Sequence, residues 1–557
     1  MNNWAIEYTK TLAPGFFVCQ VAVIGALFVI GFIICLSCIN SGNSPVERNS
    51  QTSQKGTDEK TQPGLLFKTV LLSFPVGMSA FILLAYAFLI AGVPYNSVNV
   101  SVAAIVILAL LIYRGYKNNA FDIIRTKTGQ RFLLGVLIVV SVTACFATSG
   151  IMPLSLSNDS MYYFHEYPKD IVYFGMLRDQ FDTFLTDTGL GSVVIDTLPF
   201  LFGFNESFGI REFMHINFLI YFVYRTYILI LPIVTRYVSP QGERANNESG
   251  WKGDKAARIA AIVALLIGII LATSSPVWIL GHWAMANMYF MEFFFMSALE
   301  AFYCRSENHD IRIVAILSVA CALIRIEGGV FMLLLVLCFT FLGYSGKELS
   351  LNILIPMLIM TSAYAIKIFM SYTIDNPYTF LTPEKAILQA VAMTAVILYV
   401  LFIKDRLPAS LIKFMPEVLT TGLILLNGLL LLRNRELYVL NLRAFYGNLM
   451  GQSGWGMLPH LTIAALIVAA FLYVEAKLSK RIVKTADGCV AISITKYMSV
   501  LALGFAFVTV AVSYMRGDPL NVQVGDSGNR VLLQIAPLLI FAIVCIFVKV
   551  LDTRENE

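Results

Sequence analysis

The sequence is poor in charged residues: only 13% of its 557 residues are Asp, Glu, Lys or Arg, whereas 58% are hydrophobic. Soluble domains carry roughly a quarter charged residues. Low charge together with runs of about 20 apolar residues predicts a polytopic membrane protein, and it excludes a soluble, fibrous or disordered chain. The basic residues lie between apolar runs rather than along one stripe, so we expect no binding of nucleic acid.

Several familiar sequence motifs are absent. The nine cysteines form no CxxC pair and no Cys/His cluster, so we expect buried thiols rather than a structural zinc site. No Walker or GxGxxG pattern occurs, which argues against a nucleotide-binding loop. No internal repeat is evident, which argues against a transporter built from inverted repeats.

Long apolar runs predict an all-α membrane protein with about fifteen transmembrane helices. The first run, about Phe16 to Leu36, is too long for a cleaved signal, so we expect a retained helix. Lys and Arg in short loops mark the cytoplasmic side. One alternating path satisfies this rule, with the N-terminus outside and the C-terminus inside. The runs lie near residues 15–38, 65–92, 99–113, 132–152, 216–236, 257–274, 285–304, 311–324, 328–343, 350–370, 386–403, 410–432, 459–474, 489–514 and 531–550.

The loops between these runs differ in composition. Residues 39–64 are polar and predict a flexible cytoplasmic linker. The path places residues 150–215 outside, together with a smaller loop at 433–458. The longer segment is acidic and rich in Phe and Tyr, which predicts short amphipathic helices on the membrane surface.

The first candidate site lies at the start of the long external segment, in the sequence from Ser157 to Asp170. A carboxylate at the membrane surface can act as a general base or ligate a hard divalent cation such as Mg²⁺ or Mn²⁺. Asp159 is the best placed because it is closest to the end of the preceding helix. Glu166 and Asp170 are four residues apart and share one face if the chain is helical. The alternative is a solvated acidic loop without chemistry.

The second candidate site is the sequence Arg325-Ile326-Glu327-Gly328 between two short apolar runs. Either these residues form a turn at the external surface, or a long helix carries an ion pair within lipid. Arg325 is suited to binding a phosphate, and Glu327 to orienting that arginine or a sugar hydroxyl. A purely structural Arg–Glu pair is the alternative. Glu292, inside the run 285–304, is a weaker candidate.

The third candidate site precedes the last apolar run and reads Gly525-Asp526-Ser527-Gly528-Asn529-Arg530. The N-terminus of a helix offers free N–H groups and a positive dipole end that suit a phosphate. A helix cap accounts for the residues from Asp526 to Asn529 without any ligand. It does not account for Arg530, because a cation at that end opposes the helix dipole.

Together these three motifs resemble the integral-membrane glycosyltransferases of the GT-C superfamily, which use polyprenyl-phosphate sugar donors. The resemblance covers residues 132–550 and implies a catalytic region with an external loop at 153–215, preceded by a transmembrane extension at 1–131. It implies that Asp159 is the catalytic base and that Arg530 and Arg325 bind the donor phosphate. The supporting residues are then Glu327, Glu166, Asp170, His165 and Asp526. The family often has two acids where this sequence has Asn158-Asp159, which argues against a metal held by an acidic pair.

The expected function is therefore transfer of a sugar, with inversion, from a polyprenyl-phosphate donor to a glycan, lipid or protein acceptor. We expect the site on the periplasmic face of a bacterial inner membrane. A secondary transporter or flippase for an anionic lipid-linked substrate is an alternative, and Arg225, deep in its span, suits it. An O-antigen-type polymerase or ligase, which also uses polyprenyl-linked donors, is a third possibility.

Overall fold

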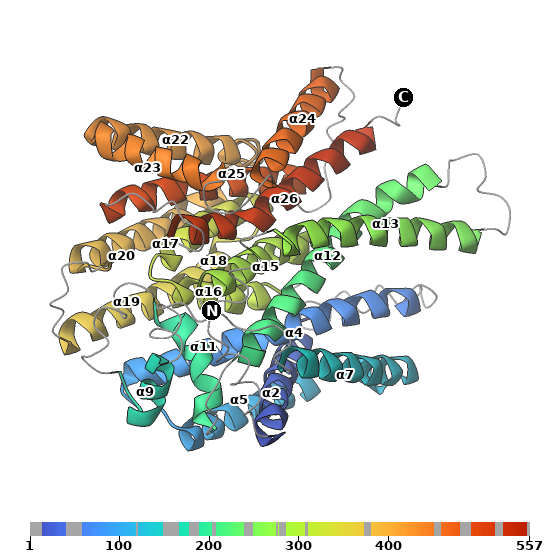
Figure 1. Cartoon of the computed structure of the whole chain (residues 1–557), viewed down its shortest axis with the longest axis vertical. Helices are drawn as coiled ribbons and strands as arrows, with labels where there is room; N and C mark the ends of the chain where they lie inside the picture. Colours follow the sequence, from blue (N-terminus) through green and yellow to red (C-terminus); the bar gives the residue numbers. More distant parts are fainter. Residues whose placement is uncertain are drawn as a thin grey trace, which may run out of the picture. The chain divides into compact units, whose positions relative to one another are not determined.

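The computed structural model describes residues 14–39, 58–117, 121–148, 166–177, 189–202, 208–238, 249–274, 277, 286–306, 310–372, 380–450, 458–478, 492–517 and 527–553. Every regular element within these ranges is a helix, which confirms the expected all-α class (Figure 1). The chain divides into two compact units. Unit 1 comprises Met1–Asn217, His282–Thr340 and Tyr344–Arg406, and unit 2 comprises Phe218–Gly281, Phe341–Gly343 and Leu407–Glu557.

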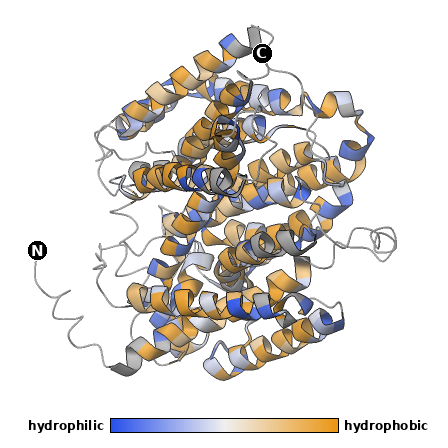
Figure 2. Ribbon diagram, turned by 90° about the vertical axis from the view of Figure 1, so that its right-hand side faces the viewer, coloured by the Kyte–Doolittle hydropathy of each residue, from blue (hydrophilic) through white to orange (hydrophobic). Residues whose placement is uncertain are grey.

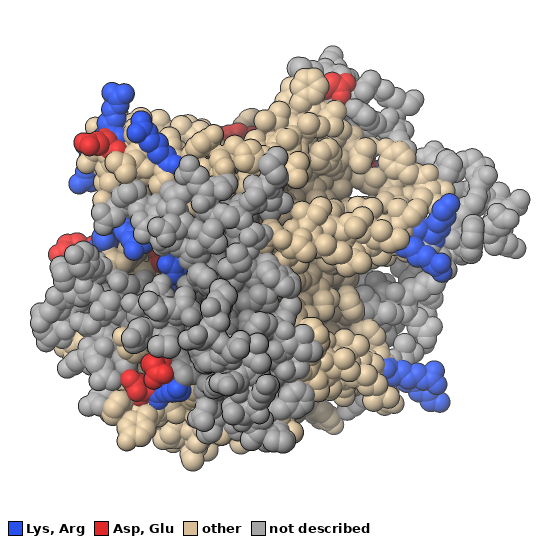
Figure 3. Space-filling model, in the orientation of Figure 1, with Lys and Arg blue, Asp and Glu red and all other residues tan. Residues whose placement is uncertain are grey.

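Eleven helices among the described residues are long and apolar enough to cross a membrane. Figure 2 shows hydrophobic residues along most of the helical ribbon, and on the face in Figure 3 most of the described surface carries neither acidic nor basic side chains. These features are those of an integral membrane protein. All eleven helices coincide with predicted apolar runs. The other four runs also form helices, but three of these are short and the fourth carries Glu292 and Glu300.

Unit 1 begins with two antiparallel helices, α2 (Pro14–Ile39) and α4 (Asp58–Ala91). Glycines let their backbones approach closely. A Cβ atom at Gly31 would lie 2.6 Å from the backbone nitrogen of Gly77, and one at Gly77 would lie 2.8 Å from the carbonyl carbon of Leu27. Small residues are favoured at such crossings because lipid provides little hydrophobic force to bring helices together.

The centre of unit 1 is α15 (Ala286–Ser306), in which every residue from Ala286 to Cys304 is buried. It packs against α16 (Arg312–Ile324), which is itself almost entirely buried. The remaining helices of unit 1 are α5 (Ser97–Lys117), α6 (Asp122–Arg125), α7 (Lys127–Thr148), α9 (Tyr167–Phe174), α11 (Leu190–Leu201), α17 (Gly328–Phe339), α18 (Gly346–Leu349), α19 (Ile355–Ser371) and α20 (Pro383–Leu398), together with the start of α12 (Phe208–Val238).

The long segment 150–215 contains the short helices α9 and α11, as the sequence predicts. The surface position expected for them is wrong for α11, because all twelve of its residues are buried. It packs against α4, α9, α15 and α16. Its sequence, LGSVVIDTLPFL, has only one charged residue, so almost its whole circumference can be buried.

Unit 2 holds α13 (Ser249–Ala272), α21 (Ala409–Ile412), α22 (Met415–Arg433), α23 (Arg435–Leu449), α24 (Leu458–Leu478), α25 (Ile494–Arg516) and α26 (Ser527–Thr553). The segment 433–458, expected as a loop, contains the fifteen-residue helix α23. Asn434 caps this helix by accepting a hydrogen bond from the Leu437 N–H at 3.0 Å. Helix α23 packs on α25 and α26.

We expect Gly31→Ala to destabilise the protein by about 1–3 kcal/mol, because the added methyl group meets backbone atoms of α4 that cannot move aside. The matched control is Gly25→Ala on the same helix, where nothing lies within 4 Å of the added atom. Thermal unfolding of both variants in detergent measures the difference. Equal melting temperatures for the two variants would contradict the close approach of α2 and α4.

Candidate functional site

A tight turn between two buried helices carries the charged pair Arg325 and Glu327. Helix α16 ends at Ile324 because Arg325 has an extended backbone, with φ −126° and ψ 153°. The Gly328 N–H donates to the Arg325 carbonyl oxygen at 2.9 Å. A Cβ atom at Gly328 would lie 2.7 Å from the carbonyl oxygen of Ala322, so a larger residue would not fit. The chain therefore turns here rather than continuing as one long helix.

The Arg325 guanidinium is held by two partners. Its Nε donates to Oε1 of Glu327 at 2.6 Å, and its Nη2 contacts the same carboxylate. Its Nη1 donates to Oδ1 of Asn287, in the first turn of α15. These two partners fix the orientation of the guanidinium. The side chain is 18% exposed, so it still reaches the surface. The remaining N–H groups of Nη1 and Nη2 are suited to an anion.

Gly189, within the long acidic segment 150–215, meets this same turn. Gly189, with φ +89°, precedes α11, and a Cβ atom there would lie 2.7 Å from the Ile326 nitrogen and 2.9 Å from the Arg325 Cα. A side chain at residue 189 would be strained both by this contact and by the positive φ. Two segments that the sequence singles out, far apart along the chain, are therefore in main-chain contact.

Tyr95 makes hydrogen bonds to α11 and to the residue that follows α9, the two short helices of the acidic segment. It lies between α4 and α5; its N–H donates to the Gly175 carbonyl oxygen at 2.8 Å, and its hydroxyl group lies 2.6 Å from Oγ1 of Thr197 on α11. Burial raises the pKa of Tyr95 well above its usual value. The phenol therefore stays protonated across the physiological range and keeps its hydrogen bond with Thr197.

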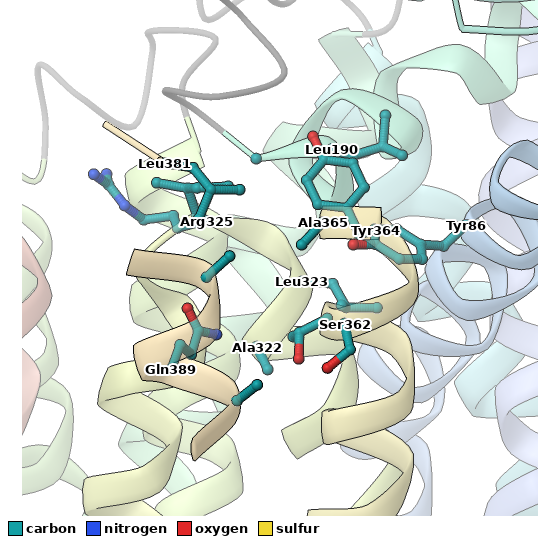
Figure 4. A pocket seen from close by; sticks show the side chains of 15 residues that line it. Tyr86, Leu190, Ala322, Leu323, Arg325, Ser362, Tyr364, Ala365, Leu381 and Gln389 are labelled. Carbon is teal, nitrogen blue, oxygen red and sulfur yellow. The ribbon is translucent and has the colours of Figure 1, made fainter. Parts of the chain in front are cut away.

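A pocket of about 40 Å³ opens beside the Arg325 turn (Figure 4). Tyr86 of α4, Leu190 of α11, Tyr364 of α19 and Gln389 of α20 contribute to its walls. In Figure 4 the guanidinium of Arg325 points away from the other labelled side chains, so it lies at the edge of the pocket rather than inside it.

A buried ion pair joins α11 to α12 within unit 1. Arg211 donates from Nε to Oδ1 of Asp196 at 3.2 Å, and its Nη2 contacts the other carboxylate oxygen. Asp196 is completely buried and Arg211 is 5% exposed. The guanidinium also lies 4.8 Å from the centre of the Tyr289 ring on α15. Burial among apolar helices disfavours an isolated charge, and these contacts give each charge of the pair a partner.

Two more buried acids lie on α15, each with a partner from another helix. Nδ1 of His215 on α12 is 3.1 Å from Oε1 of Glu292. Nζ of Lys68 on α4 is 3.3 Å from Oε2 of Glu300. Both carboxylates are at most 1% exposed. Ionisable side chains inside a membrane protein are costly, so they are rare away from functional or strongly paired positions.

Unit 2 contains two arginines of interest and one large cavity. Arg530, in the first turn of α26, is half-buried. Arg225 is buried, and its Nε donates to the hydroxyl group of Tyr221 at 3.3 Å. The cavity has a volume of about 410 Å³ and lies between α23, α24, α25 and α26. Apart from Thr462 and Ser499, its walls are apolar, so it suits a hydrocarbon rather than water.

The predicted site residues divide into two groups. Asp159, His165 and Asp526 lie outside the described residues. Glu166 directly precedes α9 and pairs with Lys169 at 3.4 Å; Asp170 lies in the first turn of that helix, in agreement with the predicted helical spacing. Arg325 and Glu327 are in direct contact, as described above.

Sequence reasoning missed the buried pairs. Asp196 and Glu212 belong to the segment expected as short amphipathic helices on the membrane surface, yet they are 0% and 2% exposed. Arg211 and His215 were not candidates. The available signal was the apolar sequence around Asp196, since a lone acid in such a helix needs a buried partner. The identity of that partner follows only from tertiary packing.

No group of three or more His, Cys, Asp or Glu side chains suited to a metal ion occurs among the described residues. Asp159 is outside that part of the chain, so a cation at Asp159 stays a prediction. No family model matches the chain, and neither a curated protein nor a solved structure matches it.

We expect Arg211→Met to lower the free energy of unfolding by about 3–5 kcal/mol, because it leaves the buried Asp196 carboxylate without its cation. The double variant Arg211→Met/Asp196→Asn removes that charge and should recover more than half of the loss. Thermal and denaturant unfolding in detergent measure both effects. A single variant as stable as the wild type would show that the pair does not hold α11 against α12.

Proposed function

We propose that this chain is a membrane glycosyltransferase that takes a sugar from a polyprenyl-phosphate donor. The observation that carries the proposal is the main-chain contact of Gly189 with the Arg325–Ile326 turn. It joins a long acidic segment, suited to activating an acceptor hydroxyl, to an oriented arginine, suited to a phosphate. In this proposal the site faces the periplasmic side of a bacterial inner membrane.

Arg325 binds the donor phosphate in this scheme. Glu327 and Asn287 hold its guanidinium plane in one orientation, so little side-chain entropy is lost when an anion binds. As the bond between the anomeric carbon and the phosphate oxygen breaks, negative charge grows on that oxygen. A fixed cation stabilises this charge more in the transition state than in the bound donor, which lowers the barrier.

Asp159 acts as the general base. It accepts the proton of the acceptor hydroxyl while the hydroxyl oxygen forms a bond to the anomeric carbon, and the polyprenyl phosphate leaves from the opposite face. The configuration at that carbon is inverted. His165, Glu166 and Asp170 support this loop, and the acceptor is a glycan, a lipid or a protein. A divalent cation, Mg²⁺ or Mn²⁺, at Asp159 would assist by neutralising the phosphate.

The lipid part of the donor needs an apolar environment. Within unit 2, the 410 Å³ cavity has hydrocarbon walls of the kind that a prenyl chain requires. Arg530, in the first turn of α26, is a second candidate phosphate contact, as the resemblance to the GT-C superfamily implies, with Asp526 as a supporting residue by its place in the sequence. No nucleotide is required, since the leaving group is the lipid phosphate itself.

A secondary transporter or flippase for an anionic lipid-linked substrate is the second candidate function. The observation that favours it is the set of buried ionisable pairs on α15, Glu292 with His215 and Glu300 with Lys68. Buried charges of this kind are found along substrate and proton paths. A transporter would move the donor across a membrane without breaking the sugar–phosphate bond, so product analysis separates the two functions. A polymerase or ligase would break that bond too and is distinguished by its acceptor.

We expect Asp159→Asn to reduce sugar transfer at least a hundredfold, which corresponds to about 2.7 kcal/mol of barrier. The amide keeps the size of the side chain but cannot accept the proton. Proteoliposomes supplied with radiolabelled polyprenyl-phosphate hexoses or pentoses and a membrane extract as acceptor provide the assay. Donor binding that persists without turnover in wild type and variant alike would favour the transporter.

We expect Arg325→Gln to lower kcat roughly a hundredfold, and Arg325→Lys to lower it less, because a lysine keeps the charge but loses the planar geometry. KM should change less than kcat, since the phosphate charge grows in the transition state. The same proteoliposome assay measures both constants. A large rise in KM with kcat unchanged would mean that Arg325 only binds the donor.

A further inference from the structure

The small pocket beside Arg325 is lined by polar side chains that have no role in the proposed phosphate site. Gln389 reaches into it from α20 on one side, and Tyr86 reaches in from α4 on the opposite side (Figure 4). Ser362 of α19 contributes a hydroxyl group. Alanines supply much of the remaining wall, at positions 322, 365, 386 and 390.

The pocket is too small for a sugar ring. Its volume is about 40 Å³, and each water-sized atom position needs roughly 10–15 Å³ on this scale, so about three or four non-hydrogen atoms fit. A pyranose ring carries many more. Only a substituent of a bound sugar therefore enters, while the ring stays outside, on the side of the Arg325 guanidinium.

The lining favours a substituent with one amide and one methyl group. The side-chain amide of Gln389 can donate to a carbonyl oxygen and accept from an N–H, so it matches another amide in both directions. The alanine side chains offer an apolar surface for a methyl group. An acetamido group has four non-hydrogen atoms and presents both features.

Other common sugar substituents fit less well. A carboxylate needs a cation, but among the described residues that line the pocket the only basic side chain is that of Arg325. Its guanidinium points away from the pocket interior and contacts Glu327. A hydroxymethyl group is smaller and leaves the alanine wall without a contact. A methyl group alone leaves the Gln389 amide unsatisfied by the ligand.

Gly329, the second of the two glycines after Glu327, leaves the space that the Gln389 side chain occupies. A Cβ atom at Gly329 would collide with Nε2 of Gln389 and lie 2.8 Å from the Cε of Met393. A residue larger than glycine at 329 would push the amide out of position. The Arg325 turn and the pocket are therefore contiguous. Arg325 lies at the edge of the pocket, and the Gln389 amide lies inside it.

We infer that this pocket recognises the acetamido group of a 2-acetamido sugar on the donor, with Gln389 pairing to the amide and the alanine wall receiving the methyl group. The inference rests on the proposed function and deepens it, because it names the sugar class. Gln389 is then a specificity residue that acts on the sugar and takes no part in bond breaking.

The test is a competition between two polyprenyl-phosphate donors, one carrying a hexose and the other a 2-acetamido-2-deoxyhexose, in proteoliposomes. We expect the wild type to favour the acetamido donor by roughly tenfold or more in kcat/KM, the range for losing one buried hydrogen-bonding partner. Gln389→Leu should remove most of this preference, because it lowers kcat/KM for the acetamido donor far more than for the plain hexose. Gly329→Ala should have the same effect, because it displaces the amide without changing its chemistry.

Thr394→Val is the matched control, since Thr394 lies on an exposed face of α20 and its hydroxyl group donates only to the Ala390 carbonyl oxygen of the same helix. It should keep the wild-type preference. Equal use of both donors by the wild type, or an unchanged preference in Gln389→Leu, would overturn the inference while leaving the glycosyltransferase proposal intact.

If neither donor is turned over, the glycosyltransferase proposal fails. A binding measurement then tests separately whether the pocket recognises the acetamido group. Saturation-transfer NMR on the acetamido methyl signal of the donor should show contact in the wild type and its loss in Gln389→Leu. Absence of that contact in the wild type would overturn the acetamido assignment as well.

Discussion

The pairing of polar groups on α15 is the constraint on which the rest of unit 1 depends. This helix is buried from Ala286 to Cys304, yet it carries one amide and two carboxylates. A buried charge without a partner costs several kcal/mol, so each of these groups must meet its partner from a specific neighbouring helix. Asn287 meets Arg325 at the end of α16, Glu292 meets His215 on α12, and Glu300 meets Lys68 on α4. These contacts select which helices lie beside α15.

The candidate site follows from this arrangement. Because Asn287 is in the first turn of α15, the Arg325 guanidinium is held at that end of the central helix. The Asp196–Arg211 pair holds α11 against α12, and the start of α11 at Gly189 then lies on the Arg325–Ile326 backbone. The glycines at 189, 328 and 329 are required there because backbone or a side-chain amide occupies the space that a Cβ atom would need. Charge pairing thus sets the position of the turn, and small residues permit its close contacts.

The two units contribute different surroundings to the proposed chemistry. Unit 1 supplies oriented polar groups: an arginine with two fixed partners and a small pocket with an amide inside. Unit 2 supplies a large apolar cavity between α23, α24, α25 and α26. A transferase and a transporter of lipid-linked sugars would each need polar and apolar surroundings, so the breaking of the sugar–phosphate bond is the property that would separate them.

The sequence by itself determined the class of the protein and the positions of its apolar helices, because runs of apolar residues long enough to span a membrane leave few alternatives to a helix. It also singled out Arg325 and Glu327 as charges between two apolar runs, but it left a surface turn and a continuous helix as alternatives, and the structure shows the turn. Tertiary structure alone decided that α11 is buried, that Asp196 pairs with Arg211, and that Gln389 lies beside Gly329. A short helix and a lone acid look the same in sequence whether they face solvent or the interior, because their partners lie far away along the chain.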